Sequence, residues 1–246
     1  MNSSKKSILN SNFTYLAAFI LPVIMMMALY YTRGIFPWGN ECYLRSDMYH
    51  QYAPFFSELW HKIRNGESLT YSWNIGMGTN FTSLFAYYLA SPSNWFVALF
   101  PQKYTIEIMN AFIILKIAGS SLSLTYYLTK HNNNKHVIAA IFGMFYGMSG
   151  FIAAYSWNIM WLDCVILIPL IMLGLERLVN ENRCIFYCIT LGLCIFTNYY
   201  IAIMVCLSVV IYYVVLMIAY NGIKSPMQYV KKFINFCVYS LLAGGL

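Results

Sequence analysis

Stretches of apolar residues, each separated from the next by a polar loop, run along most of the chain. A helix needs about 20 apolar residues to cross a bilayer, and most of these stretches approach that length. The pattern predicts one transmembrane domain over residues 1–246, an all-α polytopic helical bundle. The expected spans are 13–32, 105–128, 137–154, 164–178, 184–198, 201–220 and 233–246. Because the last stretch is short and stops among apolar residues, we expect it to be a truncated span of a longer protein.

Residues 33–104 differ from the rest in having intermediate polarity. Within them, residues 54–64 place their apolar side chains on one helical face, and Asn65-Gly66 supplies a stop signal. This predicts an amphipathic helix lying on the membrane surface. Two further apolar pieces, 81–89 and 95–100, are too short to span a bilayer and are predicted to be interfacial or re-entrant.

Composition supports a membrane protein, because 60% of the residues are hydrophobic and only 9% are charged. A soluble domain carries about 25% charged residues, so lipid must solvate much of this surface. The net charge of +7 does not indicate nucleic-acid binding, since the basic residues gather in loops between apolar stretches. The seven cysteines lie mostly in apolar stretches, and their spacing gives little support to a disulfide or a metal site.

The distribution of lysine and arginine predicts a cell-membrane protein with a cytoplasmic N-terminus. With that orientation, nine basic residues fall in cytoplasmic segments, five fall in the outer segment 33–104, and Lys116 lies within a span. The nine are Lys5, Lys6, Lys130, Lys135, Arg177, Arg183, Lys224, Lys231 and Lys232, and the five are Arg33, Arg45, Lys62, Arg64 and Lys103.

Candidate chemistry gathers on the predicted outer face. Residues 45–52 combine an acid, a base, an imidazole and two phenols. A single loop acid such as Asp47 is more often solvated than catalytic, and Asp163 has an alternative role as the cap of a helix beginning at Cys164. Lys116 stands out because placing an ionisable group within a span costs free energy, and such groups are often functional. The alternatives are that its side chain snorkels to the interface or contacts a lipid phosphate.

Five motifs resemble the bacterial YfhO family of membrane proteins over nearly the whole chain. They are the residues 44–56 (LRSDMYHQYAPFF), 71–80 (YSWNIGMGTN), 87–95 (YYLASPSNW), 157–163 (WNIMWLD) and 197–200 (TNYY). Members of that family are longer than this chain. The resemblance implies a glycosyltransferase of the GT-C type, in which an acid of the first extracytoplasmic loop lies near two helices parallel to the membrane. It also implies a polyprenyl-phosphate-linked sugar as donor and a cell-envelope polymer, such as lipoteichoic acid, as acceptor.

In this interpretation Asp47 matches the loop acid, and it acts as the general base or orients the acceptor hydroxyl for attack on the anomeric carbon of the sugar. Arg45 or His50 is the expected partner of the lipid phosphate, and the prenyl chain is expected along the glycines of 137–154. Gln51, Asn74, Asn80, Asp163 and Lys116 complete the predicted substrate-binding residues. The two acids Asp47 and Asp163 and the histidine His50 are also suited to a divalent metal, so a divalent metal is a further candidate ligand. A transporter or flippase for a lipid-linked envelope precursor is the alternative, and a non-catalytic scaffold for envelope assembly is the third interpretation.

Overall fold

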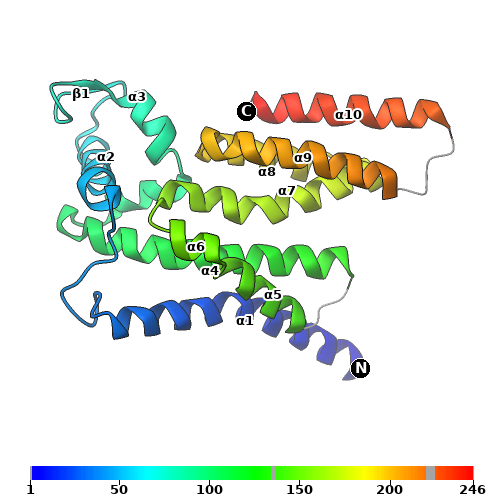
Figure 1. Cartoon of the computed structure of the whole chain (residues 1–246), viewed down its shortest axis with the longest axis horizontal. Coiled ribbons are helices and arrows are strands. Elements are labelled where there is room, and N and C mark those ends of the chain that lie inside the picture. The colour runs from blue at the N-terminus through cyan, green and yellow to red at the C-terminus, as the bar shows by residue number, and fades with distance from the viewer. Residues whose placement is uncertain (1, 134–136, 220–224, 246) are drawn as a thin grey trace.

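The computed structural model describes residues 2–133, 137–219 and 225–245, with side chains from residue 12 onward. Helices run side by side along one axis (Figure 1), as the predicted all-α bundle requires. Five helical segments of the described residues are long and apolar enough to cross a membrane. The helices of the bundle are α1 (Asn2–Thr32), α4 (Thr105–His131), α5 (Val137–Gly147), α6 (Gly150–Tyr155), α7 (Leu162–Glu181), α8 (Ile185–Thr197), α9 (Tyr199–Ala219) and α10 (Pro226–Gly244).

Each predicted span contains helical structure, but α8 and α10 are not among the five segments long and apolar enough to cross a membrane, and several boundaries differ. The stretch 137–154 is divided into α5 and α6 around Ser149. The last helix begins at Pro226, where the sequence predicted a basic loop reaching residue 232, because proline suits the first turn of a helix. The predicted boundary residues Tyr220 and Leu246, and the basic residues Lys135 and Lys224, lie outside the described residues.

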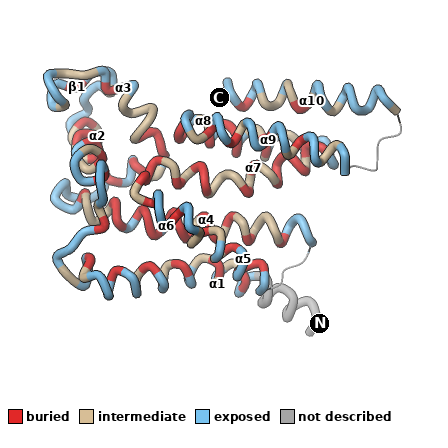
Figure 2. Tube along the Cα trace, viewed as in Figure 1, coloured by how far each residue is buried: buried red, intermediate tan, exposed pale blue. Residues whose placement is uncertain are grey.

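Helices α4 and α7 form the centre of the bundle (Figure 2). Helix α4 packs against α1, α5 and α7, while α7 packs against α8 and α9. Small polar side chains of α4 face its neighbours: the hydroxyl of Ser121 donates to the carbonyl of Ala18 at 2.6 Å, and that of Thr125 to the carbonyl of Ala139 at 3.2 Å. Such residues join helices where lipid gives no hydrophobic driving force.

Two glycines bring α5 against α4. A methyl group at Gly143 would lie 2.1 Å from the hydroxyl oxygen of Thr125, and one at Gly147 would lie 2.8 Å from the carbonyl oxygen of Ile117. Gly150, at the start of α6, has nothing within 4 Å of such a methyl group. Gly143 and Gly147 therefore allow α5 to pack closely against α4, whereas Gly150 makes no such contact.

Residues 33–104 cover one end of the bundle, and we call them the cap. Helix α2 is viewed end-on in Figure 1, so it runs across the bundle axis, as expected of a helix lying on the membrane surface. It buries Phe55, Phe56 and Leu59 and ends at Gly66, which adopts the left-handed conformation. The cap contains η1 (Met48–Tyr52), α2 (Ala53–Asn65), β1 (Tyr71–Ser72) paired antiparallel with β2 (Thr79–Asn80), α3 (Phe81–Leu84), η2 (Phe85–Leu89), η3 (Pro92–Leu99) and η4 (Gln102–Tyr104).

The contact between α4 and α5 predicts opposite effects of one substitution at two glycines. Gly143→Ala should lower the stability of the detergent-solubilised protein by about 1–3 kcal/mol, the usual effect of overpacking. Gly150→Ala should leave it unchanged or raise it, because alanine favours helix by up to ~1 kcal/mol over glycine. Thermal unfolding of both variants tests this, and equal stabilities would contradict the packing described here.

Candidate functional site at the cap end

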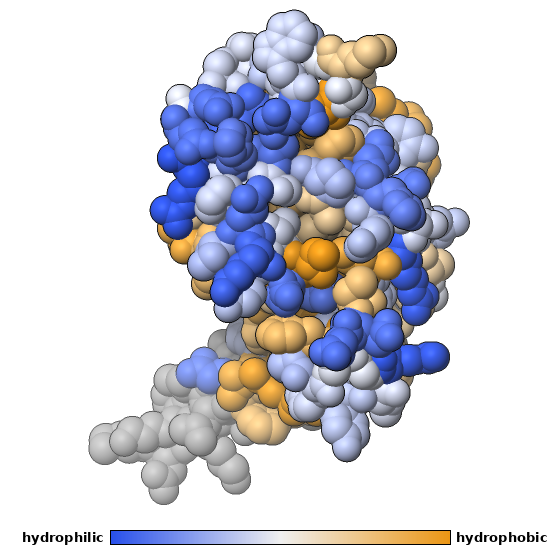
Figure 3. Space-filling view, turned by 90° about the vertical axis from the view of Figure 1, so that its left-hand side faces the viewer, coloured by the Kyte–Doolittle hydropathy of each residue, from blue (hydrophilic) through white to orange (hydrophobic). Residues whose placement is uncertain are grey.

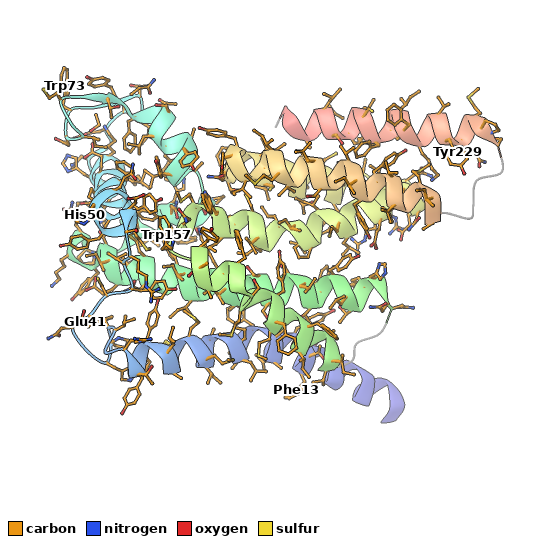
Figure 4. All side chains as sticks on the ribbon, viewed as in Figure 1. Phe13, Glu41, His50, Trp73, Trp157 and Tyr229 are labelled. Carbon is orange, nitrogen blue, oxygen red and sulfur yellow. The ribbon has the colours of Figure 1, made fainter. Side chains whose placement is uncertain are left out.

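The two ends of the bundle differ in character. Lys130, Arg177, Arg183 and Lys231 mark the end opposite the cap, which we call the basic end. The cap end presents hydrophilic residues around a less polar centre (Figure 3). The segment 156–163, which runs from the end of α6 into the first turn of α7, meets the underside of the cap, and Trp157 lies between α2 and the bundle (Figure 4). We call this segment the connector.

Asp47 is exposed and directly precedes η1. Its neighbour Ser46 has a φ of +48°, a left-handed conformation that non-glycine residues seldom adopt. The next residue, Met48, is fully buried, so the chain turns sharply between an anchored side chain and an exposed carboxylate. Strained backbone of this kind gathers at functional sites.

Two tyrosines lie within the electrostatic reach of Asp47. Burial raises the pKa of Tyr52, and the negative charge of Asp47 raises it further. Burial and the neighbouring Tyr87 raise the pKa of Tyr88, and Asp47 again contributes. Both phenols therefore remain protonated hydrogen-bond donors at neutral pH. The side-chain amide of Gln51 donates to the Tyr88 hydroxyl at 3.3 Å, so this predicted site residue does share a cluster with Asp47.

An aromatic surface, which we call the aromatic floor, lies between the cap and the bundle. Tyr52 stacks on Trp157 with ring centroids 6.2 Å apart, and Tyr88 contacts Tyr87 at 4.5 Å. Tyr87 also meets Tyr199 at 5.7 Å. The floor is therefore built from η1, η2, the connector and the start of α9.

Asn198 explains how the floor is held to α9. Its amide nitrogen donates to the carbonyl of Tyr87 at 3.0 Å, and its oxygen accepts from the backbone nitrogen of Ile201 at 2.9 Å. One buried side chain thus caps α9 and fixes η2 against it. This residue belongs to a motif seen in the sequence, but its partner is distant in the chain and only the fold reveals it.

Arg45 and His50 occupy different surroundings. The guanidinium of Arg45 lies 5.5 Å from the ring centroid of Tyr43, whose hydroxyl is 2.7 Å from that of Ser156. His50 lines an open cavity of about 500 Å³ together with Lys103 and residues of α2 and α4. Asp47 is not among the residues that line this cavity, so the cluster predicted over residues 45–52 is divided between two sides of the cap.

The two predicted asparagines of the hairpin have structural partners. The amide of Asn74 donates to the carboxylate of Glu58 at 3.0 Å, which also accepts from Ser72 at 2.7 Å. Asn80 caps α3 by accepting from the backbone nitrogen of Ser83 at 3.3 Å. These bonds account for both asparagines as residues that shape the hairpin.

Lys116 and Asp163 form one ion pair, with nitrogen and oxygen 2.6 Å apart. Lys116 is 4% exposed, and it also donates to the carbonyl of Ile159 at 3.2 Å and to the hydroxyl of Ser91 at 3.4 Å. Asp163 lies inside the first turn of α7, which begins at Leu162 rather than at Cys164, and it makes no capping bond. The charges of Lys116 and Asp163 therefore neutralise each other within the protein.

The connector carries two donors that sequence reasoning did not single out. Asn158 is 2% exposed. Its oxygen accepts from the Tyr52 hydroxyl at 3.0 Å, while its amide nitrogen is buried and has no hydrogen-bond partner within the part of the chain that the structure describes. The indole nitrogen of Trp161 is likewise buried and unpaired, and its ring stacks on Tyr200 at 6.1 Å. Buried unpaired donors destabilise the fold by about 1–3 kcal/mol each, and a ligand that accepts from them would offset that.

An apolar groove of about 380 Å³ lies between α5, α6, α7 and α9. Its walls include Phe151, Val165, Ile168 and Met204, and Tyr212 lies at its far end towards the basic end. Gly143 and Gly147 face α4 instead, so the groove follows the break between α5 and α6 rather than a stripe of glycines.

The described residues give no support to the predicted metal. Among them, no three His, Cys, Asp or Glu side chains gather closely enough to hold an ion. Asp163 is engaged by Lys116, and His50 lines a cavity to which Asp47 does not contribute. The acids and the histidine considered from the sequence therefore do not form a common site.

Comparison with known proteins identifies a family. A family model described as "Bacterial membrane protein YfhO" matches residues 17–246. No curated protein and no solved structure matches the chain.

The buried ion pair predicts a non-additive stability effect. Lys116→Met alone should lower stability by ~3–5 kcal/mol, because it leaves the Asp163 carboxylate buried without its partner. Adding Asp163→Leu should restore most of the loss, since replacing both charges by apolar groups is often neutral. Thermal unfolding of the single and double variants measures the coupling, and additive losses would contradict it.

Proposed function

This chain belongs to the YfhO family of bacterial membrane proteins, and from the geometry of its cap end we propose that it is a membrane glycosyltransferase of the GT-C type. It transfers a sugar from a polyprenyl-phosphate carrier to a cell-envelope polymer such as lipoteichoic acid. One arrangement carries the proposal: the exposed Asp47 directly precedes η1, whose Tyr52 belongs to the aromatic floor, and an apolar groove begins beside the first turn of α7, next to the connector.

Asp47 is the proposed general base. Its carboxylate takes the proton from the acceptor hydroxyl, whose oxygen then bonds to the anomeric carbon of the sugar. The bond from that carbon to the phosphate oxygen breaks, and its electron pair leaves with the lipid phosphate. The transition state has oxocarbenium character, as in other glycosyl transfers. Tyr88 remains protonated near Asp47 and accepts from Gln51, so its own hydrogen is available to a hydroxyl group of a sugar. The Tyr52 hydroxyl instead donates to Asn158 and holds η1 in place.

The aromatic floor suits a sugar ring. Trp157 is partly exposed, and Tyr52 stacks on one face of its ring. An aromatic face with polar atoms at its edge matches the two kinds of surface that a pyranose offers. The unpaired amide nitrogen of Asn158 and the unpaired indole nitrogen of Trp161 lie on the connector beneath it. We assign these neutral donors, together with Arg45, to the oxygens of the lipid phosphate.

The apolar groove is the proposed place of the prenyl chain. It lies among membrane-spanning helices, and its wall residue Val165 is two residues from Asp163, where the connector ends. A chain in the groove would therefore bring its phosphate towards Trp161 and Asn158. Lys116 does not take this role, because its ammonium group is already paired with Asp163.

The proposed orientation places the N-terminus in the cytoplasm and the cap outside. Basic residues gather at the end opposite the cap, which is the pattern of cytoplasmic loops. This puts Asp47 on the outer side, where an envelope polymer is assembled.

Loss of the Asp47 carboxylate tests the chemistry. In cells that express the protein, Asp47→Asn should reduce incorporation of labelled sugar into envelope polymer by about 10²–10⁴-fold, the range of general base catalysis. Glu41→Gln removes another exposed cap carboxylate and should have little effect at matched membrane abundance. Incorporation that needs the protein but is unchanged in Asp47→Asn would exclude Asp47 as the base, and it would favour a transporter of the lipid-linked precursor.

A natural cysteine tests the orientation. Cys42 is exposed in the cap, so a membrane-impermeant maleimide should label it in intact cells whose outer layers admit the reagent. The Cys42→Ser variant should lose that labelling. Labelling of Cys42 only after the membrane is opened would reverse the orientation and place Asp47 in the cytoplasm.

A further inference from the structure

A second polar cavity lies at the basic end, far along the bundle from the cap. It has a volume of about 310 Å³ and is lined by Lys130, His131, Glu176, Arg177, Asn180 and Glu181. These residues come from the last turns of α4 and α7. None of them takes part in the proposed transfer chemistry.

The two carboxylates of this cavity already have partners. One oxygen of Glu176 accepts from the hydroxyl of Tyr127 at 2.8 Å, from that of Tyr212, and lies 2.8 Å from a ring nitrogen of His131. Glu181 forms an ion pair with Arg183 at 3.2 Å. The two acids of the cavity therefore do not need a ligand as a hydrogen-bond or ion-pair partner.

The two strong cations of the cavity are different. Among the described residues, neither Lys130 nor Arg177 has a carboxylate within ion-pair distance. Each lies over an aromatic ring instead: Lys130 is 5.6 Å from the centroid of Tyr126, and Arg177 is 5.1 Å from that of Phe186. Lysine and arginine at helix C-termini also offset the helix dipole, but that does not account for an open polar cavity between them.

We propose that this cavity binds the phosphate of an anionic membrane phospholipid, with Arg177 and Lys130 as its ligands. A planar guanidinium held by stacking is suited to two phosphate oxygens, and the cavity lies where membrane-spanning helices end. Basic pockets between spans take lipid headgroups in this way. The bonds of Tyr212 to Glu176 lie between the cavity and the apolar groove, so this site is separate from the proposed donor site.

The test compares two substitutions that remove the same charge at the same end of the bundle. The purified full chain is incubated with micelles containing phosphatidylglycerol or phosphatidylcholine, washed with detergent, and its retained lipid is counted by native mass spectrometry. The unchanged protein should retain phosphatidylglycerol in preference to phosphatidylcholine. Arg177→Gln should reduce that retention at least about fivefold, while Arg177→Lys should keep part of it.

Lys231→Gln is the matched control, because Lys231 is exposed on α10 and outside the cavity. Retention equal to that of the unchanged protein in Arg177→Gln, or an equal loss in Lys231→Gln, would overturn the proposal. Displacement of the lipid by millimolar inorganic phosphate would overturn its assignment to a lipid. Unfolding temperatures in phosphatidylcholine micelles establish that each variant is folded. Sugar transfer is not measured, so the result is independent of the proposed function.

Discussion

The ion pair between Lys116 and Asp163 is the interaction on which the arrangement of the cap end depends. It joins α4 to α7, the two most buried spans, where isolated charges are too costly to remain ionised. The same ammonium group also holds the carbonyl of Ile159 in the connector and the hydroxyl of Ser91 in the cap. Three segments far apart in the sequence are therefore fixed around one nitrogen atom.

Around this centre, hydroxyl and amide bonds place the cap on the bundle. Tyr52 binds Asn158, Tyr43 binds Ser156, and Asn198 binds the backbone of Tyr87. Each bond links the cap to the start of a bundle helix or to the connector. Because η1 is held from below in this way, the adjoining and exposed Asp47 lies on a fixed support. A carboxylate presented on a rigid support is what general base catalysis requires.

Sequence reasoning was successful where periodicity and composition decide the outcome. The all-α membrane bundle and the amphipathic helix α2 follow from the spacing of apolar residues. Of the seven predicted spans, five correspond to helical segments of the described residues that are long and apolar enough to cross a membrane, and boundaries differ at Pro226 and at the break around Ser149. The sequence could not predict which side chains that lie far apart in the chain contact each other. Nothing in the local sequence of Lys116 indicates that Asp163 neutralises it, and nothing near Asn74 indicates that the hairpin brings it beside Glu58. Asn80 differs, because its partner is the local backbone nitrogen of Ser83.

That pairing changes the electrostatics of the proposed reaction. If Lys116 were free, it would be the obvious cation for a lipid phosphate within the membrane. Since Asp163 neutralises it, the charge that develops on the leaving group must be stabilised from the cap and the connector. In the proposed reaction Arg45 would supply the formal charge. The nitrogens of Asn158 and Trp161, which have no partner among the described residues, would supply dipoles that are already in place. Preorganised dipoles that are shielded from water stabilise a developing anion more than they would in water. The Lys116–Asp163 ion pair and the neutral donors Asn158 and Trp161 are therefore compatible with one another in the proposed reaction.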